Sequence, residues 1–384
     1  MSQEFVMPGK IISGENALEN AKEIFANAGK KALIVSGKVM EKVGNVAKVA
    51  SVLESAGVEY AIFTDIIGEP TDEMIQQGVE VYKKEQCDFL VGIGGGSPLD
   101  SIKAIAIQLD NPGKLSDYMG QTLTMDTPPM IAIPTTAGTG SEATWFTVIT
   151  DTENNVKMLL KGPAVMPDVA ILDYTFTMSS PQSVTSATGL DALTHAVEGY
   201  TSKKAQPLTD VFAISAIKRI FKYLPIAYTD GNNEEAREQM ALAALEAGIV
   251  ITNSSVTVVH GMSRPIGALF HVPHGISNAM LIKDCLEYVI DGALERFAVL
   301  GREIGVAEAE DSDEAAAKSF IAALDQLCKC CEVPTLEQYG IDKKEFFDVM
   351  DKMATDALIS GSPGNTRKEL EKEDLLNIYH TLWD

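Results

Sequence analysis

The chain has 384 residues, of which 46% are hydrophobic and 22% are charged, a composition typical of a globular protein with a large core. This length predicts two domains rather than one. The 31 basic and 54 acidic residues give a net charge of −23, which argues against nucleic acid and against anionic membrane surfaces as partners.

The cysteines and the N-terminal segment point to a cytoplasmic protein. The five cysteines are odd in number, and the CKCC spacing at 328–331 matches no zinc knuckle, so we expect reduced thiols. The start, MSQEFVMPGK, lacks the basic-then-apolar pattern of a signal peptide. No apolar run approaches the roughly 20 residues that span a bilayer.

The first half of the chain alternates strands and helices. Apolar runs predict strands at 31–36, 58–64, 88–93, 130–134 and 168–173, and helical spacing is found over 41–57 and 71–85. A hairpin is predicted in TVITDTENNVKMLL, with its turn at Glu153–Asn155. Strands that alternate with helices at this pitch indicate βαβ units, which form a parallel, doubly wound sheet.

The second half is predicted to be helical. The pattern begins in SSPQSVTSATGLDALTHAVEGYTS and continues through 206–223, 234–256, 276–303, 313–331, 344–358 and 369–382. We therefore predict an α/β domain over residues 1–180 and an all-α domain over 181–384. A cleft between two such domains is a favoured place for a ligand.

A glycine-rich loop follows the third predicted strand, in GIGGGSPLDSIKAIAI. Gly94, Gly95 and Gly96 allow close approach of an anion to the backbone. Ser97 is predicted to be the N-cap of the next helix, and Asp100 to complete a capping box. The unpaired N–H groups and the positive dipole end of that helix suit a pyrophosphate, although the loop alone is also compatible with a simple tight turn.

A second loop strengthens the prediction of a nucleotide site. PTTAGTGSE follows the fourth predicted strand and offers the hydroxyls of Thr135, Thr136, Thr139 and Ser141. Both loops lie at the carboxyl ends of strands, where doubly wound sheets bind ligands.

A metal site is predicted in the second domain. Asp191 and His195 stand four residues apart on a helix and share one face, and His260 and His274 lie in the apolar stretch HGMSRPIGALFHVPHG. One carboxylate and three imidazoles suit a divalent ion such as Fe²⁺, Zn²⁺, Ni²⁺ or Co²⁺. His271 is either a fifth group near this site or a core histidine.

These motifs together resemble the iron-containing, metal-dependent alcohol dehydrogenases. The resemblance is carried by GGGSPLDSIKA, PTTAGTGSE, DALTHAVEGYTS and HGMSRPIGALFHVPHG, in this order, and it covers nearly the whole chain. It implies an N-terminal dinucleotide-binding α/β domain and a C-terminal helical metal-binding domain. It also implies NAD(P) and Fe²⁺, or another divalent metal such as Zn²⁺, as cofactors.

The resemblance also assigns individual residues. The metal ligands would be Asp191, His195, His260 and His274. The nucleotide would contact the two loops described above, with Asp100 on the nicotinamide side, Lys157 in the hairpin and Leu172 beside the nicotinamide.

Two positions depart from the pattern of the family. Many NAD-dependent members carry an acidic residue at the end of the strand equivalent to KALIVS, whereas this chain has Gly37 followed by Lys38. We therefore predict that NADP(H) is accepted. Many members also have a histidine four residues after the third ligand, where this chain has Arg264.

The expected activity is reversible hydride transfer between a short alcohol or aldehyde and NAD(P), with His271, a ribose hydroxyl or a water as proton carrier. Arg264 either pairs with an acidic residue or binds the anionic tail of a semialdehyde or sulfonated aldehyde. The alternatives are a lyase resembling dehydroquinate synthase and a non-enzymatic binding protein. We expect a homodimer or larger homo-oligomer, with no nucleic-acid or membrane partner.

Overall fold

The protein is described by a computed structural model that covers residues 2–111, 113–154 and 156–383. Its contacts divide the chain into two compact units. The α/β unit is Val6–Ser179, and the helical unit runs from Ser180 onward and includes the few residues before Val6. Phe5 stacks on Phe212, and Gln206 donates a hydrogen bond to the carbonyl of Glu4, so this N-terminal segment packs within the helical unit. A domain boundary between residues 180 and 181 remains our proposal.

The α/β unit is built on a parallel sheet in the order β1-β8-β5-β4-β2-β3. Its strands are β1 (Lys10–Ser13), β2 (Lys31–Val35), β3 (Glu59–Phe63), β4 (Phe89–Gly94), β5 (Met130–Pro134) and β8 (Val169–Leu172). A separate antiparallel hairpin joins β6 (Phe146–Asp151) and β7 (Val156–Lys161). The hairpin confirms the pairing expected from the sequence; its predicted turn includes Asn155, which lies outside the described residues.

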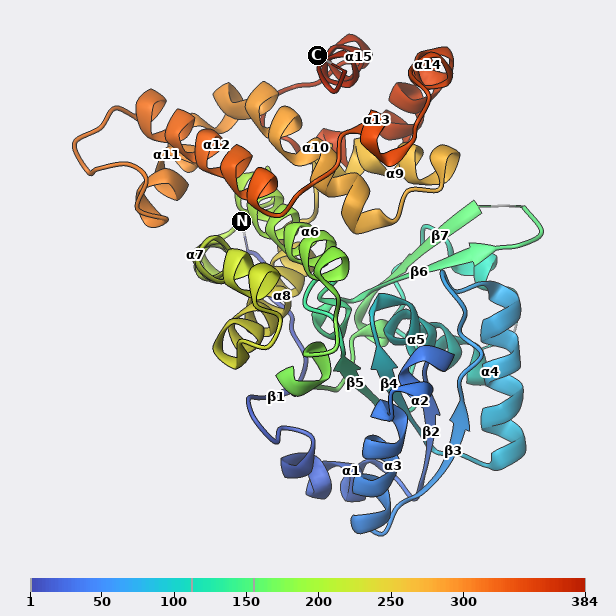
Figure 1. Ribbon diagram of the computed structural model, residues 1–384. Coiled ribbons are helices and arrows are strands. Elements are labelled where there is room, and N and C mark those ends of the chain that lie inside the picture. Colours follow the sequence, from blue (N-terminus) through green and yellow to red (C-terminus); the bar gives the residue numbers. More distant parts are fainter. Residues whose placement is uncertain (1, 112, 155, 384) are drawn as a thin grey trace. The chain divides into compact units, whose positions relative to one another are not determined.

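Helices cover both faces of the sheet (Figure 1). They are α1 (Lys22–Ala28), α2 (Lys38–Lys42), α3 (Asn45–Ser55), α4 (Asp72–Glu85) and α5 (Gly96–Asp110). Alternate residues of a strand enter different cores, as Leu33 packs with α4 and α5 whereas Ile34 packs with α1 and α3. Burial on both faces explains why these strands read as continuous apolar runs.

Two elements of this unit differ from the prediction. The helix expected over 41–57 is two helices, α2 and α3, because Gly44 between them adopts a left-handed φ of 83°. Strand β1 was not predicted, since KIIS has only four residues and two of them are exposed. It forms because it pairs along β8, from Lys10 with Val169 to Ser13 with Leu172.

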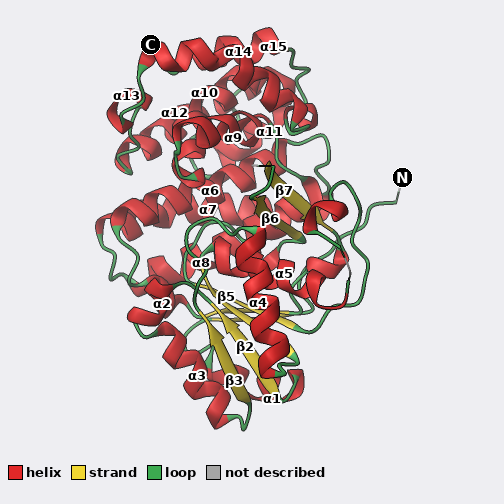
Figure 2. Ribbon diagram, turned by 90° about the vertical axis from the view of Figure 1, so that its right-hand side faces the viewer, coloured by secondary structure: helices red, strands yellow, loops and turns green. Residues whose placement is uncertain are grey.

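In the helical unit, the described residues form no strand (Figure 2). Its helices are α6 (Gln182–Thr201), α7 (Pro207–Thr229), α8 (Glu234–Ser254), α9 (Val258–Phe270), α10 (His274–Val289), α11 (Leu294–Glu303), α12 (Asp313–Cys330), α13 (Leu336–Tyr339), α14 (Lys343–Ile359) and α15 (Lys372–Thr381). The helix predicted over 276–303 is interrupted by a 3-10 turn at Ile290–Ala293. There the α-carbon of Gly292 faces the backbone of Lys368 so closely that a side chain would not fit.

Helix α6 is the central element of this unit. It packs against α7, α8, α9 and α10, and every residue from Gly189 to Thr201 is buried. The predicted fold class, an α/β unit with a parallel sheet followed by an all-α unit, is confirmed. Among the described residues no single helix passes the length and apolarity criteria for a membrane span; α8 and α9 pass them only as a pair, bent by 104°.

Candidate metal and cofactor sites

Four side chains that sequence reasoning selected as metal ligands lie together in the helical unit. Asp191 and His195 come from the middle of α6, His260 from the first turn of α9 and His274 from the first residue of α10. Their ligand atoms all lie within 4.8 Å of one another. Helix α6 and the two consecutive helices α9 and α10 therefore converge on one small volume.

The distances within this cluster suit a shared ion. The Oδ1 atom of Asp191 is 3.9 Å from Nε2 of His195, 3.9 Å from Nε2 of His260 and 3.7 Å from Nε2 of His274. Two ligand atoms about 2.1 Å from one ion at a tetrahedral angle are about 3.4 Å apart, so a contraction of a few tenths of an ångström closes the site.

The protonation states also favour a cation. Burial, reinforced by the neighbouring imidazoles of His195 and His274, holds the pKa of His260 well below its ordinary value, so its ring is neutral. Burial alone would raise the pKa of Asp191, but the three imidazoles and the amide of Asn278 outweigh it and lower this pKa. The site thus offers an ionised carboxylate at Asp191 and a neutral imidazole at His260, the forms in which these groups bind metals.

Glu198 fixes the orientation of the His260 ring. Its Oε2 atom lies 2.5 Å from Nδ1 of His260, and its Oε1 atom accepts hydrogen bonds from the Thr257 hydroxyl at 2.7 Å and the Val259 amide at 2.6 Å. The carboxylate is fully buried. With Nδ1–H donated to Glu198, the Nε2 lone pair of His260 is directed at the cluster.

Asn278 completes the surroundings of the cluster. Its Nδ2 atom donates to Oδ1 of Asp191 at 2.7 Å and lies 3.2 Å from Nε2 of both His260 and His274. Glu198 and Asn278 were both missed from the sequence. The feature of the sequence that could have revealed Glu198 is a carboxylate three residues after His195 whose immediate neighbours in the chain are apolar or small.

The two residues proposed near the reacting group lie at the surface. Arg264, four residues after His260 on α9, is exposed and donates a hydrogen bond to the Ser362 hydroxyl at 3.0 Å. It forms no ion pair with any described residue. His271 ends α9 in a left-handed conformation with φ 55° and is exposed.

The glycine loop of the α/β unit differs from the prediction in its capping. Helix α5 begins at Gly96, and its N-cap is Gly95, with no side chain capping the helix. The prediction that Ser97 is the N-cap and Asp100 part of a capping box is therefore wrong. The absence of a side-chain cap leaves the first N–H groups of α5 for another acceptor, which suits an anion at this end.

The second loop packs directly on the first. A Cβ added to Gly95 would lie 3.4 Å from Oγ1 of Thr136, and one added to Gly96 would lie 3.1 Å from Cγ2 of Thr139. The amide of Thr135 also donates to the carbonyl of Gly94 at 2.9 Å. The lack of side chains at these glycines thus allows the two loops to approach each other closely, and it would also allow a ligand to approach the backbone.

Two of the predicted cofactor contacts are engaged within the protein. The hydroxyl of Ser141 donates to Oδ1 of Asp100 at 2.6 Å, and Oδ2 of Asp100 accepts from the amide of Val148 at 2.9 Å. Asp100 is therefore held against the second loop by these two hydrogen bonds, and Leu172 is buried at the end of β8.

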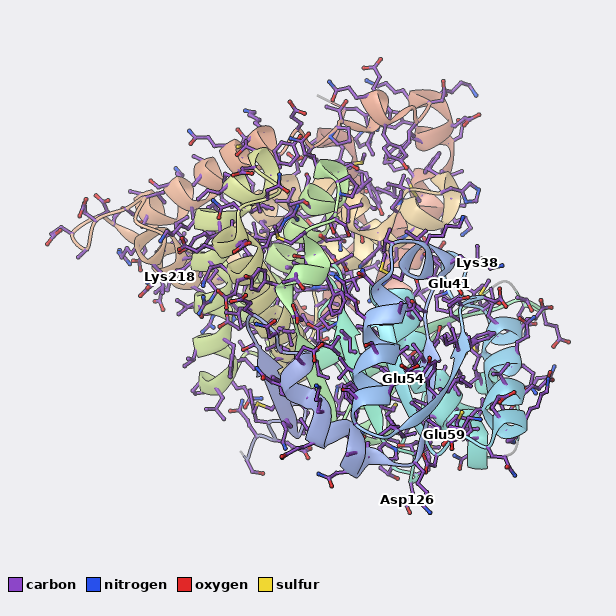
Figure 3. All side chains as sticks on the ribbon, turned by 60° about the horizontal axis from the view of Figure 1, so that its bottom comes forward. Lys38, Glu41, Glu54, Glu59, Asp126 and Lys218 are labelled. Atoms are coloured by element: carbon purple, nitrogen blue, oxygen red, sulfur yellow. The ribbon has the colours of Figure 1, made fainter. Side chains whose placement is uncertain are left out.

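The end of β2 carries a charge pair that the sequence did not reveal. Gly37 forms a backbone bridge with Asp65, and the ammonium of Lys38 lies 2.9 Å from Oδ1 of Asp65. Lys38 and Glu41 lie on the surface at α2 (Figure 3). Lys157 of the hairpin is similarly paired, 2.6 Å from Oε1 of Glu69.

The strand order locates the crevice of the sheet. The chain leaves β2 for β3 on one side, whereas it leaves β4 for β5 on the other. Ligands of doubly wound sheets bind outside the carboxyl ends of strands at such a reversal. Here that position lies between Ser36 and Gly94, where the Ser36 hydroxyl donates to the carbonyl of Ile93 at 2.6 Å.

Comparison with known proteins gives a consistent result over the whole chain. The model of the iron-containing alcohol dehydrogenases matches residues 8–174, and that of the C-terminal part of the Fe-containing alcohol dehydrogenase family matches 185–383. The NAD-dependent methanol dehydrogenase of Bacillus methanolicus is 37% identical over 356 residues, 92% of this chain and 93% of its own.

Solved structures agree. The crystal structure of a 1,3-propanediol oxidoreductase superposes with a TM-score of 0.96 at 36% identity and covers 100% of both chains. The sulfoacetaldehyde reductase of Bifidobacterium kashiwanohense, solved in complex with NAD⁺, superposes with a TM-score of 0.89 at 29% identity, covering 100% of this chain and 99% of its own.

Proposed function

The chain belongs to the iron-containing alcohol dehydrogenase family, and we propose that within it the protein reduces a short-chain aldehyde with an anionic tail. The reaction class, oxidoreduction of alcohols and aldehydes with a nicotinamide cofactor, follows from the family and its relatives. The observation that carries the assignment of the site is the convergence of Asp191, His195, His260 and His274 within 4.8 Å.

These four side chains fit the metal that the family requires. They would hold a divalent ion, with the carboxylate of Glu198 orienting His260 and the amide of Asn278 orienting Asp191. When bound, the ion supplies Lewis-acid polarisation of the substrate oxygen, and the nicotinamide gives or takes the hydride. We propose Fe²⁺ as the ion, with Zn²⁺ as a competitor because the usual affinity order favours it.

The cofactor would lie at the loops of the α/β unit. The uncapped start of α5, with Gly95, Gly96 and Ser97, would accept the pyrophosphate. The hydroxyls of Thr136 and Thr139 are the available donors of the second loop, since Ser141 is already bonded to Asp100. Lys157 remains a candidate contact if it leaves Glu69.

We propose that both NADH and NADPH are accepted. Gly37 presents no carboxylate, and Lys38 offers a cation for a 2′-phosphate, but Asp65 offsets that charge at 2.9 Å. Asp65→Asn should then raise the ratio of kcat/KM for NADPH to that for NADH, by up to about 5-fold for an exposed charge. Asp126→Asn is the control, since Asp126 precedes β5 and lies toward the amino ends of the strands, away from Lys38 (Figure 3). An equal change in both variants would contradict a role for Asp65.

Arg264 is the proposed recognition element for the substrate tail. It lies one helical turn from His260, it is exposed, and it donates a hydrogen bond to a neutral hydroxyl. A guanidinium that forms no ion pair with a described carboxylate can bind a carboxylate or sulfonate bidentately. A relative that acts on sulfoacetaldehyde supports this substrate class.

The decisive experiment compares two aldehydes of equal length, one neutral and one anionic. The protein is loaded with Fe²⁺ under anaerobic conditions, and oxidation of NADH is followed for propanal and for malonic semialdehyde. Arg264→Leu should lower kcat/KM about 10- to 100-fold for the anionic aldehyde and spare the neutral one.

Ser362→Ala is the matched control, because it removes the hydroxyl that accepts from the guanidinium and leaves the charge of Arg264. If both aldehydes lose activity equally in Arg264→Leu, or neither does, the arginine is structural and the substrate is a neutral alcohol or diol. We propose that His271, a ribose hydroxyl or a water carries the proton. By analogy with the family, we also propose a cytoplasmic location and a homodimer or larger homo-oligomer.

A further inference from the structure

Lys103 is a lysine with no exposed surface, at the midpoint of α5. Its ammonium donates to the hydroxyl of Ser141 at 2.9 Å, to the carbonyl and hydroxyl of Thr144 at 3.0 Å each, and to the carbonyl of Phe146 at 2.7 Å. All four acceptors lie within residues 141–146, which form the end of the second cofactor loop and the segment that follows it.

A buried ammonium is unfavourable unless its hydrogen bonds and charge are satisfied. Burial lowers the pKa of Lys103 to about 8, while the carboxylates of Asp100 and Glu142 act in the opposite direction. The Asp100 carboxylate lies 3.9 Å away and is itself bonded to Ser141 and Val148. Lys103 and Asp100 thus clamp one loop segment from one face of α5.

The same helix carries the glycine loop at its first turn. Gly96 is the first residue of α5, and its α-carbon packs against Thr139 of the second loop. Lys103 joins α5 to residues 141–146, so its hydrogen bonds fix the distance between the glycine loop and the second loop. The side chain of Lys103 is buried, so it would affect a bound ligand through the position of the loops and not by direct contact.

We propose that Lys103 is a positioning residue for the cofactor, which holds the second loop at the spacing from the glycine loop that NAD(H) requires. The inference rests on the proposed use of these two loops as the nicotinamide-cofactor site. It assigns a task to a residue that neither the hydride transfer nor the metal cluster uses.

The test is Lys103→Met, which retains the length and apolar stem of the side chain and removes its charge and donors. The dissociation constant of NADH, measured by nicotinamide fluorescence, should rise about 10- to 100-fold. The affinity for Co²⁺, measured by competition with a chelating dye, should stay at the value of the unsubstituted protein. In the turnover assay the KM for NADH should rise while kcat stays within about 3-fold.

Two further variants separate positioning from loss of stability. Ile105→Val removes a methyl group from the buried face of the same helix, where Ile105 packs on Gly78 of α4, and should lower the melting temperature without changing the NADH affinity. Thr144→Val removes one hydroxyl from the ammonium and should weaken NADH binding about 2- to 5-fold.

Folded Lys103→Met with unchanged NADH affinity would overturn the inference, as would an equal loss of NADH and Co²⁺ affinity. If Lys103→Met does not fold, Thr144→Val decides: unchanged NADH affinity in that variant overturns the inference as well. Failure of the unsubstituted protein to bind NADH overturns the proposed function and this inference together, whereas normal binding with unaffected variants overturns this inference alone.

Discussion

At the scale of single residues, Glu198 is not a candidate metal ligand itself but orients the ring of His260, which is one. It accepts from Nδ1 of His260, from the hydroxyl of Thr257 and from the backbone amides of Val259 and His260, so four contacts fix its position. A charged acceptor at Nδ1 both selects the tautomer and increases the basicity of the opposite ring nitrogen.

Glu198→Gln should therefore weaken metal binding about 10- to 100-fold at neutral pH while the protein remains folded. Competition of the protein with a chelating dye for Co²⁺ or Zn²⁺ measures this directly. Glu246→Gln is the control, because Glu246 is a partly buried carboxylate of α8 whose partners are the Ser215 hydroxyl at 2.9 Å and the Arg219 guanidinium at 3.3 Å. Equal metal affinities in the two variants would contradict the role assigned to Glu198.

At the scale of elements, the metal cluster depends on the close packing of α6. A Cβ added to Gly199 would lie 2.2 Å from Cγ1 of Val250 and 2.8 Å from the hydroxyl of Ser254 on α8. Helix α6 carries two of the four candidate ligands, so its distance from α8 is a precondition for the site rather than a detail of the core.

Gly199→Ala should destabilise the protein by about 1–3 kcal/mol through overpacking. The melting temperature measured by circular dichroism should fall by roughly 2–12 °C. Gly364→Ala should leave it nearly unchanged, since nothing lies within 4 Å of the added atom. Similar melting temperatures for the two variants would show that α6 and α8 can separate at little cost.

Most of these elements were accessible from the sequence because their signals are local. The five predicted strands are apolar runs, and the four candidate metal ligands stand in recognisable spacing on apolar segments. Strand β1 could not be predicted, because KIIS is stabilised only by its pairing with residues about 160 positions later. The break at Gly292 likewise depends on the backbone of Lys368.

The details of the candidate sites were harder to predict from the sequence, because they too depend on partners that are distant in the chain. Lys38 reads as a free cation until Asp65 is brought beside it by the pairing of β2 with β3. Asp100 reads as a helix cap until the second loop delivers Ser141 and the Val148 amide to its two oxygens. Side-chain partners supplied by another strand or loop leave no trace in the local pattern.

At the scale of the whole molecule, the candidate metal ligands and the glycine loop belong to different compact units. Removal of the metal by a chelator should therefore abolish turnover while NADH binding persists. The same treatment should lower the melting temperature, because a ligand present at 100 times its dissociation constant contributes about 2.7 kcal/mol to the folded state.

Parallel titrations of the metal-free and reloaded protein with NADH, followed by fluorescence, provide the measurement. Reloading with Fe²⁺ under anaerobic conditions should restore turnover and the original melting temperature. A loss of NADH affinity that accompanies loss of the metal in folded protein would show that the two functions are not separable.

The pairing of β1 with β8 also has a consequence for biosynthesis. Lys10 emerges from the ribosome early, but its partner Val169 follows 159 residues later by sequence position. At about 5–20 residues per second, roughly 8–30 s pass before the partner has been synthesised. KIIS has no strand to join during that interval, and β5 (Met130–Pro134), once it has been made, is a temporary sheet edge until β8 follows. The nascent chain therefore carries an open edge that can pair with other chains, and translation speed or chaperone supply should limit the yield of folded enzyme more than its final stability does.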